Sequence, residues 1–427
     1  MLFASLLHPV TERIDPRDKN QLLEFLRDLK PDKRFDKPLK LAMNLHEFEP
    51  KNREETFRET YKAFTERLQK RAQLAGDHQA SEVKEANPLV ALQAAPGGGK
   101  SYFLDLLAQL RKEDIQQYCN AQMPQKEKEK ENEHQENEKE GNDDKGKEKE
   151  KAEGETIEGY FRQMRDILSH SIPICVSFNG KSPITDQEHK QQDMLGRLTL
   201  RMLHSYFFSD LPFTQFVTKC YSEMTSLPAF EDALQCIRNH WESLGKTGSS
   251  ILLCVDELIR AAADLTPAEP KSPLSPEGIQ KLVGLLHQAC ATLDKQGPEK
   301  LNLVVTTLDV APIVGATTGS QRPVKWTPLP PLTQVSAEKL FVPLLASVTN
   351  ERRRQLQLCI SDCAGHPRTL EGLYGILKSA TYRQEARPAK ILDHLADQQV
   401  LQMSTTRAAP FETVKVCYIL RFPPTVN

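Results

Sequence analysis

One glycine-rich stretch limits the fold of this chain more than any other part of it. Residues 94–101 read Ala-Ala-Pro-Gly-Gly-Gly-Lys-Ser, between an apolar run over 89–93 and a helical pattern from 101 onward. Small residues let backbone N–H groups curl around phosphate oxygens, and the N-terminus of the following helix favours the same negative charge. The stretch therefore matches the P-loop pattern, with Ala94 in place of its first glycine.

The loop predicts which residues contact a nucleotide. The Lys100 ammonium is placed to reach the β- and γ-phosphates, and the Ser101 hydroxyl to bind Mg²⁺. The alternative is a glycine-rich strand-to-helix turn without a ligand. The residues predicted to bind the cofactor are Ala95, Pro96, Gly97, Gly98, Gly99, Lys100, Ser101 and Tyr102.

Polar residues end two later apolar runs. The run 251–255 leads into Asp256-Glu257, and the run 301–307 ends in Thr306-Thr307. Carboxylates at the carboxyl edge of a parallel sheet lie beside its phosphate loop. We expect Asp256 to hold Mg²⁺, directly or through water, and Glu257 to act as the general base that polarises the attacking water.

The pattern of apolar residues over 88–335 predicts an α/β fold. Short apolar runs over 89–93, 172–178, 251–255, 301–307 and 324–326 alternate with helical patterns, for example at 101–119, 187–208 and 275–295. Such alternation indicates a parallel sheet between layers of helices. After about residue 335 only helical patterns are found.

The chain divides into three predicted regions. Residues 1–85 form a helical N-terminal region without predicted chemistry, 86–335 the core, and 336–427 a helical lid and tail. Within the core, residues 126–155 carry 8 Lys and 13 acidic residues and almost no apolar side chain. Because such a segment cannot bury enough apolar surface to offset its ordering entropy, we expect a disordered insertion, with a solvated helix as the alternative.

Charge and cysteine content limit the class of partner and the compartment. The 56 Lys and Arg and 58 Asp and Glu give a net charge of −2, which argues against a strongly basic nucleic-acid binder and leaves nucleic-acid binding through a local basic patch open. No apolar run approaches the ~18 residues of a membrane helix, so no membrane partner is expected. Nine cysteines without a CxxC pair favour reduced thiols, hence an intracellular location, cytoplasmic or nuclear, with use as a secreted effector left open.

Several strings occur together in a recognisable order. They are Ala-Pro-Gly-Gly-Gly-Lys-Ser (95–101), Pro-Ile-Cys-Val-Ser-Phe-Asn-Gly (173–180), Leu-Cys-Val-Asp-Glu (253–257), Gln-Arg-Pro-Val-Lys-Trp (321–326) and Gly-His-Pro-Arg (365–368). This order resembles the P-loop NTPase module of Crinkler-type proteins, which are related to the AAA+ and STAND ATPases. The resemblance covers roughly residues 85–380; the translocation header and effector domain common in that family are not found in this sequence.

The resemblance implies a fold and further site residues. It implies a five-stranded parallel sheet of order 5-1-4-3-2 flanked by helices, a C-terminal helical lid, and ATP as the nucleotide. A polar residue at the end of the fourth strand would touch the γ-phosphate or the lytic water, and Thr307 or Thr306 fits that place. The arginines implied to stabilise charge are Arg368 in the lid, Arg322 and Arg201, each with a structural salt bridge as its alternative.

The function expected from these observations is a Mg²⁺-dependent ATPase of the AAA+/STAND type that acts as a nucleotide-driven switch. Its partners would be ATP and ADP and either another protein or a second copy of the chain. The first alternative is a nucleotide-binding interaction module that hydrolyses little or nothing. The second is a P-loop kinase acting on a small molecule, which the long interval between Ser101 and Asp256 and the lid motif disfavour.

Deletion of residues 126–155 tests the predicted insertion. We expect the melting temperature and the ATP affinity to stay nearly unchanged, because a solvated segment adds little to a core and long surface insertions cost little closure entropy. Thermal unfolding and nucleotide titration measure both quantities, with the same residues in shuffled order as the control. A large fall in melting temperature would mean that the segment packs against the core.

Overall fold

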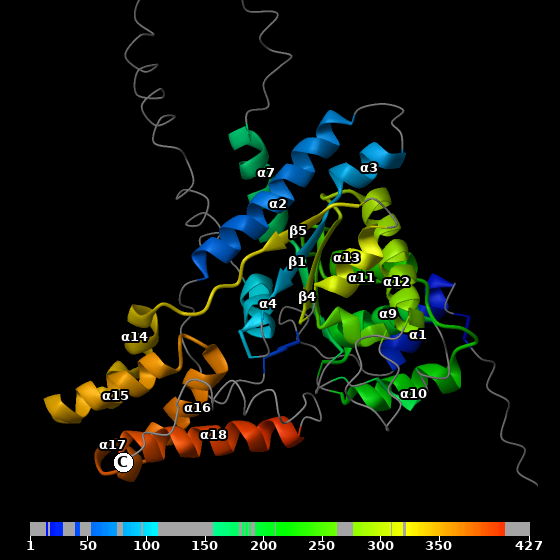
Figure 1. Cartoon of the computed structure of the whole chain (residues 1–427). Helices are drawn as coiled ribbons and strands as arrows, with labels where there is room; N and C mark the ends of the chain where they lie inside the picture. The colour runs from blue at the N-terminus through cyan, green and yellow to red at the C-terminus, as the bar shows by residue number, and fades with distance from the viewer. Residues whose placement is uncertain are drawn as a thin grey trace, which may run out of the picture.

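A parallel five-stranded sheet forms the centre of the computed structural model of the protein (Figure 1). Its strands lie in the order β2-β3-β4-β1-β5, and each neighbouring pair is parallel. The predicted α/β class is therefore confirmed, and so is the order 5-1-4-3-2, read from the other edge. The strands are β1 (Leu89–Gln93), β2 (Ile172–Ser177), β3 (Ile251–Asp256), β4 (Leu301–Thr307) and β5 (Val324–Thr327).

The structure describes residues 14–15, 18–28, 39–42, 53–74, 80–94, 97–109, 157–178, 182, 184–186, 188, 193–209, 211–262, 276–308, 310–318 and 322–405. The predicted insertion at 126–155 lies outside these ranges, as do Ala95, Pro96 and the chain after residue 405. Within them, no helix has the length and apolar character needed to cross a membrane.

Helices cover both faces of the sheet because alternate side chains of each strand point to opposite faces. One apolar cluster joins strand residues such as Ala91 and Val305 to α9, α11 and α12; the other joins Leu92 and Val304 to α2, α4 and α7. Every residue of β3 and β4 is buried, which explains their continuous apolar runs. These helices are α2 (Glu54–Gln73), α4 (Lys100–Gln109), α7 (Ile157–Ser169), α9 (Met194–Phe207), α11 (Phe230–Ser243) and α12 (Pro276–Gln296).

The N-terminal helices share the core of the sheet. Leu22 and Phe25 of α1 (Lys19–Asp28) belong to the first apolar cluster, and Phe57 and Phe64 of α2 to the second. The buried carboxylate of Asp105 on α4 also accepts hydrogen bonds from the backbone N–H groups of residues 41 and 42, at 2.7 and 2.8 Å. The smaller elements are α3 (Ala80–Ala86), α10 (Phe213–Glu223), the 3-10 helix η2 (Leu258–Ala262) and α13 (Ala311–Thr318).

Residues 334–405, in the region predicted to be a lid and called the lid below, form helices with an apolar cluster of their own (Figure 1). The apolar stripe of α16, from Leu370 to Leu377, is buried in this cluster. The turn before α16 packs against the lid linker, residues 328–333: the Leu332 N–H donates to Gly365 O at 2.8 Å. The lid helices are α14 (Gln334–Leu345), α15 (Asn350–Asp362), α16 (Pro367–Lys378), α17 (Ala380–Gln384) and α18 (Pro388–Thr405).

Substitution of Gly365 tests the contact between the lid and its linker. Gly365 has a φ of +69°, and a Cβ there would lie 1.9 Å from Leu332 O. We therefore expect Gly365→Ala to lower the free energy of unfolding by about 2–3 kcal/mol, measured by urea denaturation. Gly284→Ala is the matched control: with nothing within 4 Å of its Cβ on α12, it should stabilise by up to about 1 kcal/mol. Equal stability of the two variants would contradict this packing.

Candidate functional site

The predicted phosphate loop and the acidic strand end meet at the carboxyl edge of the sheet. The loop follows β1, and α4 begins at Lys100 directly after it. Asp256 is the last residue of β3, and β4 lies between β3 and β1. Because all strands are parallel, these ends converge on one edge.

A chain of hydrogen bonds joins three of these segments. The Ser101 hydroxyl donates to one carboxylate oxygen of Asp256 at 2.7 Å, and the Thr306 hydroxyl donates to the other at 2.7 Å. The backbone N–H of Glu257 in turn donates to the Thr306 hydroxyl oxygen at 3.0 Å. The network ties α4, β3 and β4 together around one buried carboxylate, 1% exposed.

Strand register decides between the two threonines of β4. Val255 pairs with Val305, so Asp256 and Thr306 are neighbours on the same face of the sheet, the face covered by α4. Thr307 follows on the opposite face because side chains alternate along a strand. Of the predicted pair, Thr306 is therefore the residue that contacts Asp256. The role expected of Thr307 at the nucleotide stays a prediction.

The Lys100 side chain is buried beside the two carboxylates. Its ammonium donates to Ala94 O at 2.6 Å. Burial lowers the pKa of Lys100 to about 8, against the opposing influence of Glu257 and Asp256, while Arg368 adds to the lowering. A further anion next to this ammonium would favour its charged form.

Glu257 is held in an unusual backbone conformation. Its φ of +52° is in the left-handed region, which costs a non-glycine residue roughly 1–2 kcal/mol. The Arg260 N–H donates to Glu257 O at 2.9 Å, and the Arg260 guanidinium forms an ion pair with the Glu257 carboxylate. Burial raises the pKa of Glu257, and the charge of Arg260 is the largest influence opposing that rise. Arg260 was not indicated by the sequence pattern.

The lid reaches the phosphate loop through the start of α16. The Arg368 N–H donates to Gly97 O at 3.3 Å, and the Arg368 side chain is exposed. Gly97 has a φ of +76°, and a Cβ there would lie 2.8 Å from both Arg368 Cβ and His366 Cε1, so only glycine fits. The charge of Arg368 acts on the pKa values of Lys100 and Glu257. Its contact with a γ-phosphate stays a prediction.

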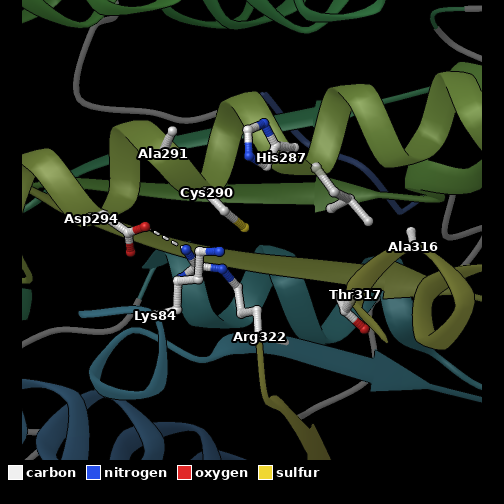
Figure 2. Close-up of a pocket in the computed structure, with 9 residues that line it drawn as sticks. Lys84, His287, Cys290, Ala291, Asp294, Ala316, Thr317 and Arg322 are labelled. Carbon is white, nitrogen blue, oxygen red and sulfur yellow. Dashed lines mark hydrogen bonds and ion pairs between the residues drawn. The ribbon is translucent and has the colours of Figure 1, made fainter. Parts of the chain in front are cut away.

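Arg322 lies at the other edge of the sheet. It precedes β5 and donates to Asn87 O just before β1, and five residues of β1, about 16 Å of strand, separate that edge from the loop. Figure 2 shows its guanidinium paired with Asp294, beside a cavity of about 130 Å³. The expectation that Arg322 stabilises charge at the site is therefore corrected: its donors cap the amino edge of the sheet.

Arg201 has the structural role that was its alternative. Its guanidinium pairs with the buried Glu188, donates to Ser177 O at 3.2 Å, and lies 4.5 and 4.3 Å from the ring centres of Phe178 and Phe213.

One arginine of the N-terminal region contacts the phosphate loop, although no chemistry was predicted there. Arg53, at the start of α2 and 3% exposed, donates to Gly98 O at 3.4 Å and to Pro330 O at 2.6 Å. Burial lowers the pKa of Arg53, and the nearby Tyr102 and Glu54 oppose that lowering. No local pattern indicates such a contact, because 277 residues separate Arg53 from Pro330.

Comparison with known proteins gives one structural likeness. No protein-family model matches the chain, and no curated protein sequence matches it. Among solved structures, the Orc1 protein of Aeropyrum pernix in complex with DNA is similar, with a TM-score of 0.38 and 13% identity over 83% of this chain and 68% of that chain. The resemblance to Crinkler-type proteins stays a prediction.

Thr306→Val tests the hydrogen-bond chain. The variant leaves Asp256 without one donor and the Glu257 N–H without its acceptor, so we expect a loss of about 1–3 kcal/mol in the free energy of unfolding, measured by urea denaturation. The control is Thr65→Val on α2, whose buried hydroxyl only donates to Tyr61 O of its own helix at 3.0 Å. If both substitutions cost the same, Thr306 does not hold the network together.

Proposed function

We propose that the protein is a Mg²⁺-dependent P-loop ATPase of the AAA+/STAND type. The observation that carries the proposal is the 2.7 Å hydrogen bond between Ser101 at the start of α4 and Asp256 at the end of β3, beside the buried Lys100. A P-loop hydroxyl and a strand-end carboxylate are the pair that holds Mg²⁺ in such enzymes. A glycine-rich turn without a ligand would not require them to meet.

The residues fit Mg²⁺ and phosphate. The Ser101 hydroxyl and the Asp256 carboxylate are oxygen donors, the kind that Mg²⁺ prefers, and they would hold the ion directly or through water. Gly97, Gly98 and Gly99 provide backbone N–H groups at the N-terminus of α4, where negative charge is favoured. Lys100, whose pKa burial lowers, would gain a compensating anion. Bound Mg²⁺ would neutralise charge that develops on phosphate oxygens.

Hydrolysis would use the groups around Asp256. Glu257 is the proposed general base that takes a proton from the attacking water, and its raised pKa makes it a better proton acceptor than an ordinary carboxylate. Thr306 fixes the backbone of Glu257 through the N–H of that residue. Lys100 and Arg368 supply positive charge for the γ-phosphate, with Arg368 contributed by the lid. Nucleotide would thus couple the sheet to the lid, with partner binding or self-association as the output.

A nucleotide-binding module that hydrolyses slowly or not at all is the second candidate. The ion pair between Arg260 and Glu257 favours it, because a carboxylate engaged by a guanidinium is a weaker base. The two candidates share nucleotide binding and differ only in turnover.

Two substitutions test the proposed function. Lys100→Ala removes the ammonium, so we expect ATP affinity to fall at least about a hundredfold with the fold retained. Glu257→Gln keeps the shape of the side chain and removes its basicity, so we expect parental ATP affinity and a loss of turnover of about a hundredfold or more. Titration with a fluorescent ATP analogue and a phosphate-release assay measure the two quantities.

The outcomes separate the candidates. Unchanged affinity in Lys100→Ala would remove the P-loop assignment. Parental turnover no higher than that of Glu257→Gln would favour the binding module. Phosphate transfer only when a small-molecule acceptor is added would indicate the kinase. Lys325→Ala is the control for loss of a lysine, since Lys325 pairs with Glu66 of α2 and lies opposite Val90, near the amino end of β1.

A further inference from the structure

Helix α2 runs along the sheet and is fixed at the amino edge. The fully buried Arg67 guanidinium donates to Leu301 O at 2.6 Å and to Leu293 O at 3.0 Å, at the start of β4 and near the end of α12. Burial lowers the pKa of Arg67 to about 9. With 20 residues, α2 spans about 30 Å, so this anchor fixes the position of its other end relative to the sheet.

The other end of α2 meets the phosphate loop and the lid linker together. Arg53 donates to Gly98 O in the loop and to Pro330 O in the linker, at 3.4 and 2.6 Å. One turn later, the Thr56 hydroxyl donates to Pro328 O at 2.7 Å. Arg53 thus touches both loop and linker, whereas the Thr56 hydroxyl touches only the linker.

Peptide geometry links these carbonyl contacts to phosphate binding. In a trans peptide the C=O and the following N–H point in opposite directions. The bond from Arg53 to Gly98 O therefore turns the Gly99 N–H away from Arg53, and the bond from the Arg368 N–H to Gly97 O turns the Gly98 N–H away from the lid. Two outside contacts thus fix the direction of two N–H groups that a phosphate would use.

The lid linker is stiff and contacts two lid helices or their turns. Residues 328, 330 and 331 are proline, whose ring fixes φ, so the segment is stiff. It continues into Thr333, the N-cap of α14, and Leu332 donates to Gly365 O in the turn before α16. A shift of Pro330 would therefore act on the start of α14 and, through Gly365, on the start of α16, which carries Arg368.

We propose that Arg53 is a positioning residue of the nucleotide site, which acts through the Gly98 and Pro330 carbonyls so that phosphate binding at the loop sets the position of the lid. The coupling to phosphate rests on the proposed function; the joint hold on loop and linker does not. A guanidinium suits this role because its forked donors reach two carbonyls at once, which a lysine ammonium on a single stem does less well.

Hydrogen exchange of the full chain without nucleotide tests the joint hold. We expect Arg53→Ala to speed amide exchange about tenfold or more in peptides that contain Gly97–Gly99 and in peptides that contain Leu329 and Leu332. Thr56→Val, the matched control, should speed only the linker peptides. Arg53→Lys should leave amide exchange in the linker peptides near the parental rate and speed exchange in the loop peptides. It replaces the alanine variant if that variant does not fold. Parental exchange in the loop of both Arg53 variants would overturn the proposal.

A second arm adds ADP·Mg²⁺ or the β,γ-imido analogue of ATP with Mg²⁺. In the parent and in Thr56→Val, nucleotide should slow exchange at Leu332, and in Arg53→Ala this response should be lost at nucleotide concentrations that saturate the variant. Nucleotide binding by the parent without any response at Leu332 would overturn the coupling. If the parent binds neither nucleotide, the proposed function fails, and the first arm still decides whether Arg53 joins loop and linker.

Discussion

The buried carboxylate of Asp256 is the interaction on which the arrangement of the site depends. A carboxylate that is 1% exposed needs hydrogen-bond donors, since an ionised group without them is costly to bury. Its donors are hydroxyls from two separate elements, Ser101 of α4 and Thr306 of β4. Both can reach it only if β3, β4 and β1 lie side by side in register, so this polar requirement and the apolar packing of the sheet select the same topology.

The charges around Asp256 are arranged so that none is isolated. Glu257 has Arg260 as its ion-pair partner, and Lys100 lies within the influence of both carboxylates and of Arg368. The pKa of Lys100 is nevertheless lowered to about 8, so burial outweighs the two carboxylates. One more anion near Lys100 would therefore stabilise its charged form. Glu257 also has a left-handed backbone conformation, which persists only where surrounding contacts hold it. Here those contacts come from Thr306 and Arg260.

Local patterns predicted the strands, the loop and Asp256 because each is a property of a few consecutive residues. The choice between Thr306 and Thr307 was not local: it follows from the pairing of Val255 with Val305, which fixes the faces of β4. The position of Arg322 follows from the direction of β5, which is parallel to β1. A residue just before β5 lies at the amino edge of the sheet, away from the phosphate loop, whatever its neighbours in sequence. Arg53 needed the complete fold, because its partners at Gly98 and Pro330 come from opposite ends of the core.

The buried arginines show why residue type and motif position alone did not identify which arginines lie at the site. Arg67, Arg201, Arg238 and Arg322 bind backbone carbonyls near the ends of strands or helices. There a guanidinium with five donors satisfies acceptors that the elements leave open. A guanidinium used in this way has its donors committed to the fold. Arg368 differs because its backbone N–H, rather than its side chain, holds the lid to Gly97. Its side chain is exposed, and its charge acts on the pKa values of Lys100 and Glu257. The exposure of its side chain therefore distinguishes Arg368, the arginine proposed to contact the γ-phosphate, from the arginines that hold the fold: Arg67, Arg201, Arg238 and Arg322.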